Sequence, residues 1–258
     1  TYTEENAFNL TMIPELTQAN VSPRQDGWSV SRNFSVKVTD IGDTVNISLW
    51  IKKTTTGSWQ LINYTECVDC TDQEIIINYT FTYTDVETAD HWYFKFNATD
   101  TEGNNYTTTG SDYVNSDDSF DIEKDDVTFI YIAGNETTTT KTSSTTFILL
   151  VNDTDRGETL SSSIPSASIE FFVTKNDSNY LSDGTAPTNS TGYANYDFTA
   201  DCTYDPGKQK WRARVSLSDS YYKSSYSSPY NVTLDMQCPE FNVTNIYNPG
   251  EAFQYKPF

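Results

Sequence analysis

The sequence predicts an all-β protein built from two tandem antiparallel β-sandwiches. Three observations support this fold class. Apolar and polar residues alternate in many short segments, turn-forming residues separate these segments at regular intervals, and no stretch of useful length has a helical period. At 258 residues, the chain is long enough for two domains that each bury a core.

The first half contains seven predicted strands. In one of them Phe34, Val36 and Val38 share a face, which is typical of a half-buried strand. Ile41-Gly42-Asp43 and Glu102-Gly103-Asn104 predict turns. The strands lie near residues 7–13, 28–39, 44–53, 58–64, 74–84, 91–99 and 105–114.

The second half repeats this pattern, with turns at Asp155-Arg156-Gly157, Asp183-Gly184 and Asp205-Pro206-Gly207. The acidic stretch from Asp117 to Asp126 separates the halves. We therefore expect domains at 1–122 and 123–238, followed by a tail at 239–258. The strands of the second half lie near residues 127–133, 145–152, 167–174, 178–182, 193–200, 210–217 and 229–236.

The formal net charge of −20 opposes binding to nucleic acid and to anionic lipid, because both are polyanions. No run of about 18 apolar residues is present, so we expect no transmembrane segment in this chain. Neither nucleic acid nor a bilayer is therefore an expected partner.

Asn-x-Ser/Thr triplets are roughly three times as frequent as chance predicts, which indicates an N-glycosylated exterior protein. In six of the predicted strands the sequon asparagine lies on the polar face, which has room for a glycan; these are Asn33, Asn46, Asn78, Asn97, Asn152 and Asn231. The fourteen candidate glycosylation sites are Asn9, Asn20, Asn33, Asn46, Asn63, Asn78, Asn97, Asn105, Asn135, Asn152, Asn176, Asn189, Asn231 and Asn242.

Segments in both halves carry a family resemblance. Trp92 to Asn104 alternates aromatic residues and then reads Ala-x-Asp-x-x-Gly-Asn, and the second half contains Thr191 to Tyr196 followed by Trp211 to Val215. These segments resemble the immunoglobulin-like domains of prokaryotic, especially archaeal, cell-surface and S-layer-type glycoproteins. The resemblance implies immunoglobulin-like sandwiches and an extracellular, cell-surface location, and it identifies no activity.

The tail repeats a pattern from the start of the chain. Phe8 to Pro14 resembles Phe241 to Ile246, so we expect residues 239–258 to open a further repeat of the same kind. The alternative is a strand that completes the sheet of a neighbouring subunit.

The four cysteines, Cys67, Cys70, Cys202 and Cys238, imply disulfides in an exterior protein, and they allow three pairings. The immunoglobulin-like strand order places Cys202 and Cys238 at the same pole, which implies Cys202–Cys238 and a local Cys67–Cys70 bond. The Cys-x-x-Cys spacing also fits a redox motif or half a zinc site. Its position between strands and the single histidine oppose both readings.

No residue pattern indicates catalysis, so we expect no enzyme. The one histidine, His91, lies on a polar strand face, and no nucleophile elbow or phosphate-binding glycine loop is present. Covalent N-glycans aside, we expect no cofactor. The single candidate is Ca²⁺ at Asp153, Asp155 and Glu158, with Asp100 to Asn104 as a looser second loop, although Arg156 departs from the usual ligand pattern.

The sequons lead to a functional hypothesis. In an immunoglobulin-like order, glycans at Asn33, Asn46, Asn78 and Asn97 cover both outer faces of the first domain. Poles, edges and terminal segments are then left for contacts. We expect a structural glycoprotein subunit whose partners are copies of itself in a surface layer, sheath or filament. One alternative is a stalk or adhesin ectodomain that binds another surface or carbohydrate, and the other is a spacer of a larger surface enzyme.

Overall fold

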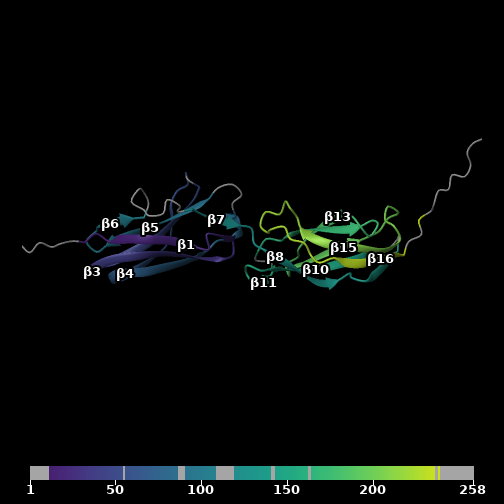
Figure 1. The fold of residues 1–258 in the computed structure, drawn as a ribbon, viewed down its shortest axis with the longest axis horizontal. Coiled ribbons are helices and arrows are strands. Elements are labelled where there is room, and N and C mark those ends of the chain that lie inside the picture. The colour runs from purple at the N-terminus through teal and green to yellow at the C-terminus, as the bar shows by residue number, and fades with distance from the viewer. Residues whose placement is uncertain are drawn as a thin grey trace, which may run out of the picture.

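The computed structural model describes residues 12–54, 56–86, 91–108, 119–140, 143–161 and 164–235, together with Cys238. The described chain is all-β apart from one 3₁₀ turn (Tyr83–Asp85), which confirms the predicted fold class. Two lobes lie end to end along the long axis of the molecule (Figure 1). The first contains β1 to β7 and the second β8 to β16.

The first lobe is a seven-stranded sheet that folds over on itself. β3 and β4 pair along their whole lengths, while β1 pairs with the first half of β3 and β5 with its second half. Phe34 in the first half of β3 nevertheless touches Phe94 on β5, with ring centroids 5.4 Å apart, so β3 must bend back over the core. The strands are β1 (Glu15–Ser22), β2 (Gln25–Gly27), β3 (Ser31–Lys53), β4 (Gln60–Thr80), β5 (Trp92–Asp100), β6 (Asn105–Thr107) and β7 (Ser119–Glu123).

Two of the predicted chain breaks in this lobe are wrong. The predicted strands 28–39 and 44–53 form the single strand β3, and 58–64 and 74–84 largely merge into β4. Gly42, with φ of +92°, marks a bulge at which both strands bend together and not a reversal of the chain. The expected strand at 7–13 lies mostly outside the described residues, and β1 was not predicted.

The second lobe is a sandwich of a four-stranded and a five-stranded sheet. Phe147 of one sheet stacks on Trp211 of the other, with ring centroids 4.2 Å apart, and this pair marks the centre of the core. All seven predicted strands have counterparts, and two short strands, β9 and β11, join them. The strands are β8 (Val127–Ala133), β9 (Thr137–Thr140), β10 (Thr145–Asp153), β11 (Glu158–Thr159), β12 (Ser168–Thr174), β13 (Tyr180–Pro187), β14 (Tyr193–Phe198), β15 (Gly207–Val215) and β16 (Tyr230–Asp235).

Both disulfides that the resemblance implied are present. Cys67 bonds to Cys70 at the bend of β4, and Cys202, in the β14–β15 loop, bonds to Cys238 beyond β16. The tail at 239–258 lies outside the described residues, as do the sequons at Asn9 and Asn242. In the part of the chain that the structure describes, no helix has the length and apolar character needed to cross a bilayer.

Candidate metal centre at the lobe junction

The connection between the lobes, residues 124–126, is bonded to the second lobe along its backbone. The Asp125 N–H donates to the Tyr221 carbonyl (3.0 Å), and the Lys223 N–H donates to the Asp125 carbonyl (2.9 Å). The Lys223 ammonium then pairs with Glu123 (2.8 Å) and Asp126 (3.2 Å) on either side of Asp125. The connection is therefore an ordered part of the junction.

Aromatic side chains close the junction beside this connection. Trp28 of the first lobe donates its indole N–H to the Tyr221 carbonyl (3.1 Å) and meets the Tyr222 ring edge-on. Tyr83 makes an edge contact with Tyr221, with centroids 5.4 Å apart. Trp28 and Tyr222 are buried, at 3% and 1% exposed, so the interface excludes water at its centre. A cleft that includes Trp28, Tyr83 and Arg156 in its lining opens alongside.

Three carboxylates meet at this junction. Asp125 comes from the connection, Asp153 ends β10, and Asp155 lies in the turn before β11. One oxygen of each lies within 4.8 Å of the others. Asp125 and Asp153 are completely buried. Gly27 of β2 packs against the cluster so closely that a Cβ there would meet oxygens of Asp125 and Asp155.

Backbone donors hold one oxygen of each carboxylate in place. Ser29 N–H donates to Asp125 Oδ1 (3.1 Å), the N–H groups of Asp155 and Arg156 donate to Asp153 Oδ1, and Asp126 N–H donates to Asp155 Oδ2 (2.8 Å). With both buried carboxyls ionised, Asp125 Oδ2 and Asp153 Oδ2 have no hydrogen-bond partner among the described residues. Unsatisfied buried carboxylate oxygens are costly, so this arrangement calls for a positive occupant or a proton.

The electrostatics of the cluster agree with this. Burial raises the pKa of Asp125 to about 7, the charges of Asp153 and Asp155 add to the rise, and the hydrogen bond from Ser29 opposes it. Burial also raises the pKa values of Asp153 and Asp155, although a hydrogen bond from a protonated Asp125 acts against the rise at Asp153. Without a cation, the cluster therefore retains a proton near neutral pH.

A buried arginine forms the floor of the junction. The Arg32 guanidinium is fully buried and donates to the carbonyls of Asp26 (2.8 Å), Asp121 (2.9 Å), Val30 and Gly27. Burial lowers the pKa of Arg32, and the carboxylates of Asp26 and Asp125 oppose that shift. Carbonyls occupy both terminal nitrogens, and the buried Nε has no partner in the described chain, so Arg32 ties β2, β3 and β7 together without a hydrogen bond to the acidic cluster.

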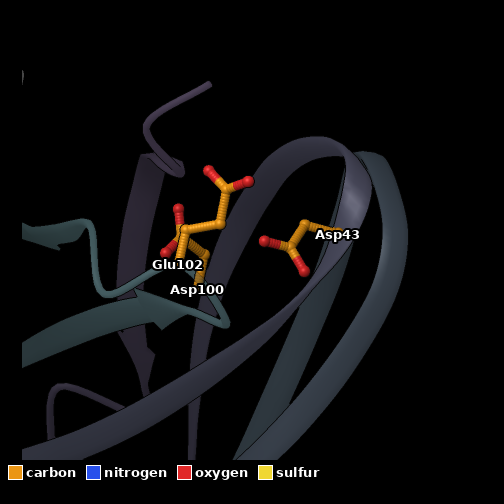
Figure 2. A group of neighbouring side chains, drawn as sticks. All are labelled: Asp43, Asp100 and Glu102. Carbon is orange, nitrogen blue, oxygen red and sulfur yellow. The ribbon is translucent and has the colours of Figure 1, made fainter. Parts of the chain in front are cut away.

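A second acidic group lies at the opposite end of the first lobe, where Asp43, Asp100 and Glu102 approach one another (Figure 2). Local donors satisfy much of this group. Asn104 donates to both oxygens of Asp100 (2.7 and 2.8 Å), and Thr101 and Thr44 donate to Asp43, which lowers the Asp43 pKa. The nearby Asp40 has one buried oxygen without a hydrogen bond in the described chain.

The structure regroups the calcium candidates. Asp153 and Asp155 come together, but Glu158 pairs with the guanidinium of Arg156, and Asp125 takes its place. Asp100 and Glu102 of the looser loop do meet, with Asp43 as the third member. His91 has an exposed side chain in contact with Asp121.

The twelve sequon asparagines that the structure describes all reach the surface, and none has a buried side chain. Asn20, Asn33, Asn63, Asn78, Asn105, Asn176 and Asn189 are exposed, and Asn46, Asn97, Asn135, Asn152 and Asn231 are half-buried. In the sequons of Asn46, Asn176 and Asn189, the Ser or Thr hydroxyl donates a hydrogen bond to the side-chain carbonyl oxygen of the asparagine. The amide nitrogen Nδ2, to which a glycan would be attached, takes no part in this bond.

No protein-family profile and no curated protein matches the sequence. Two solved structures share features of the architecture. One is described as a tetra-tandem repeat in the extending region of a large adhesion protein (TM-score 0.45, 13% identity, 86% of this chain and 49% of that chain). The other is a red sea bream transglutaminase (TM-score 0.35, 10% identity, 84% of this chain and 31% of that chain). This chain thus spans less than half of either protein, and similarities this low carry no function across.

Proposed function

We propose that this chain is a rigid spacer in an extracellular surface protein, of the stalk or adhesin-ectodomain type. The observation that carries the proposal is the junction. Two sandwiches lie end to end (Figure 1), and hydrogen bonds, ion pairs and buried rings hold the short connection between them. Such a unit sets a fixed distance and direction between whatever lies at its two ends.

Rigidity follows from how many independent contacts would have to break for the lobes to bend. Trp28 would lose its hydrogen bond to Tyr221 and its packing on Tyr222. Lys223 would have to separate from Glu123, because the two residues belong to different lobes. A flexible linker has none of these restraints.

The exterior location is supported by chemistry. Two disulfides are typical of oxidising compartments, and every described sequon asparagine has access to solvent. We infer that these sequons carry N-glycans. The charge of −20 and the glycans would together keep an extended rod hydrated and dispersed.

We also propose that the chain is not an enzyme. His91, the one histidine, has an exposed side chain, and its ring contacts the Asp121 carboxylate. Asp125 and Asp153 are completely buried, so neither carboxylate is open to a substrate from solvent.

Self-assembly into a layer, sheath or filament is the second candidate, and one observation favours it. Within the described chain β4 pairs only with β3, so one edge of this 21-residue strand is free. Leu61, Tyr64, Val68 and Ile76 expose about half or more of their surface along it. A long free edge with apolar side chains is suited to contact with another copy, unless glycans on the same strand prevent it.

Small-angle scattering and negative-stain microscopy of the purified chain would test the spacer. We expect monomers with one angle between the lobes. Trp28→Ala should broaden the angle distribution, whereas Trp59→Ala, outside the junction, should leave it narrow. A broad distribution in the unmodified chain would refute the rigid spacer. Regular tubes, sheets or filaments would instead support assembly through the poles and edges.

A further inference from the structure

We propose that the lobe junction is a calcium site, in which the carboxylates of Asp125, Asp153 and Asp155 hold one Ca²⁺ ion. This goes beyond a spacer role, because it makes the stability of the junction depend on the surrounding medium. The inference stands on the geometry of the cluster and does not require the spacer function to be correct.

The first argument is charge. Asp125 and Asp153 are completely buried, each has an oxygen without a hydrogen-bond partner, and one oxygen of each lies within 4.8 Å of the other. The cations nearby are engaged elsewhere. Lys223 pairs with Glu123 and Asp126, and Arg156 pairs with Glu158 and lies over the Trp28 ring. Arg32 and Arg156 attract the carboxylates of Asp125 and Asp153, but no side chain of the described residues donates a hydrogen bond to either buried oxygen while both carboxyls are ionised.

The second argument is fit. Oxygens bound to one Ca²⁺ at about 2.4 Å can lie at most about 4.8 Å apart. The three carboxylates offer oxygens within 4.8 Å of one another, so a single ion can reach all of them. The donor set contains only oxygen, which favours Ca²⁺ over the transition metals that prefer nitrogen and sulfur. Gly27 leaves room for two of the carboxylates, because a Cβ there would meet Asp125 Oδ1 and Asp155 Oδ2, the oxygens that backbone donors hold.

The third argument is pre-organisation. Backbone N–H groups of Ser29, Arg156 and Asp126 fix one oxygen of each carboxylate, and they leave Asp125 Oδ2 and Asp153 Oδ2 without a donor. The donor at Ser29 belongs to the first lobe, and Asp153 and Asp155 belong to the second. An ion bound here therefore connects both lobes through Asp125.

The rival occupant is a proton. With no cation bound, Asp125 keeps a proton near neutral pH and donates a hydrogen bond toward Asp153. The other charged groups that face the cluster are Asp26, Asp126, Arg32, Lys223 and Arg156. Calcium must displace the proton, so affinity should fall as the medium becomes acidic.

The far-pole group of Asp43, Asp100 and Glu102 is the weaker candidate. Asn104 already satisfies both oxygens of Asp100, and two threonines donate to Asp43. It therefore serves as an internal comparison for the junction site.

The test is thermal unfolding of the full chain in EGTA and in CaCl₂ up to about 10 mM, at constant ionic strength set with NaCl. If calcium binds at about 0.1 mM, the melting temperature should rise by about 5–10 °C. Asp125→Asn and Asp153→Asn should abolish the rise. Asp72→Asn removes an exposed charge and Asp43→Asn alters the far pole, and both should retain it.

Asparagine at either junction position removes a buried charge, so both variants should melt in EGTA at or above the unmodified temperature, which also shows that they fold. If either fails to fold, isothermal titration of the unmodified chain gives the answer, with one ion bound at pH 8 and markedly weaker binding at pH 5. The proposal is overturned if calcium produces no shift and no binding heat. It is also overturned if both junction variants keep the shift, or if Asp43→Asn alone removes it.

Discussion

The calcium-free junction should make stability fall as pH rises, and Asp125→Asn should remove this dependence. The folded pKa of Asp125 is about 7, against an ordinary value of 3.8. Between these values the folded chain holds a proton that the unfolded chain releases, so the free energy of unfolding decreases from about pH 4 to about pH 7 and then levels off. The difference of about three pKa units corresponds to about 4 kcal/mol from this group.

The assay is denaturant unfolding in EGTA at unit steps from pH 4 to pH 8, for the unmodified chain and Asp125→Asn. The two should have similar stability at pH 4, and the variant should be more stable by up to about 4 kcal/mol at pH 8. Carboxylates with lowered pKa values, such as Glu123 and Asp201, act in the opposite direction at lower pH, but both proteins contain them. A stability difference that does not change with pH would refute the reasoning.

Further predictions concern the two disulfides, Gly27 and the sequons. Replacing Cys202 and Cys238 by alanine should lower the free energy of unfolding by about 4 kcal/mol, because this bond closes a separation of 36 residues. The same change at Cys67 and Cys70, separated by 3, should cost about 2 kcal/mol in denaturant titrations. Gly27→Ala should abolish the calcium-induced rise in melting temperature and cost about 1–3 kcal/mol, because the added methyl group meets Asp125 Oδ1 and Asp155 Oδ2 and so displaces both carboxylates. Glycopeptide mass spectrometry of protein from its native source should find glycans on most of the twelve described sequons, and a chain unmodified at all of them would contradict the exterior assignment.

The strands were predictable because alternation is a local property, but the bend in β3 was not. Inward-facing residues occupy even positions up to Asp40 and odd positions from Val45 onward. A tight turn and a bulge both produce such a change of phase. Which one forms depends on β4, whose irregular positions at Asp69 and Asp72 match the bend from about thirty residues further along the chain. The few residues over which a strand pattern is read contain the bend of β3 or that of β4, but not both.

The junction site was predictable only in part, because two of its residues lie close together in the sequence and the third does not. Asp153 and Asp155 stand two residues apart beside a glycine turn, which is a visible ligand pattern. Asp125 lies in an acidic stretch whose composition indicates a solvated linker, and only the folded chain shows it to be buried. The buried position of Arg32 could have been predicted from the sequence. The residue lies on the apolar face of its strand, next to Phe34 in phase, and a charge on a buried face requires several partners.

The position of the acidic cluster decides what calcium could do for a rod of this kind. An ion within one sandwich would stabilise that lobe and leave the angle between lobes unchanged. Here Asp125 lies on the connection itself, receives a hydrogen bond from Ser29 of the first lobe and faces Asp153 of the second. When the carboxyls of this cluster lose their proton and no Ca²⁺ is bound, their mutual repulsion opposes closure of the junction. Binding of Ca²⁺ has the opposite effect and favours closure. In a calcium-free chain, the distribution of angles between the lobes should therefore be narrower at pH 5, where the proton replaces the ion, than at pH 8.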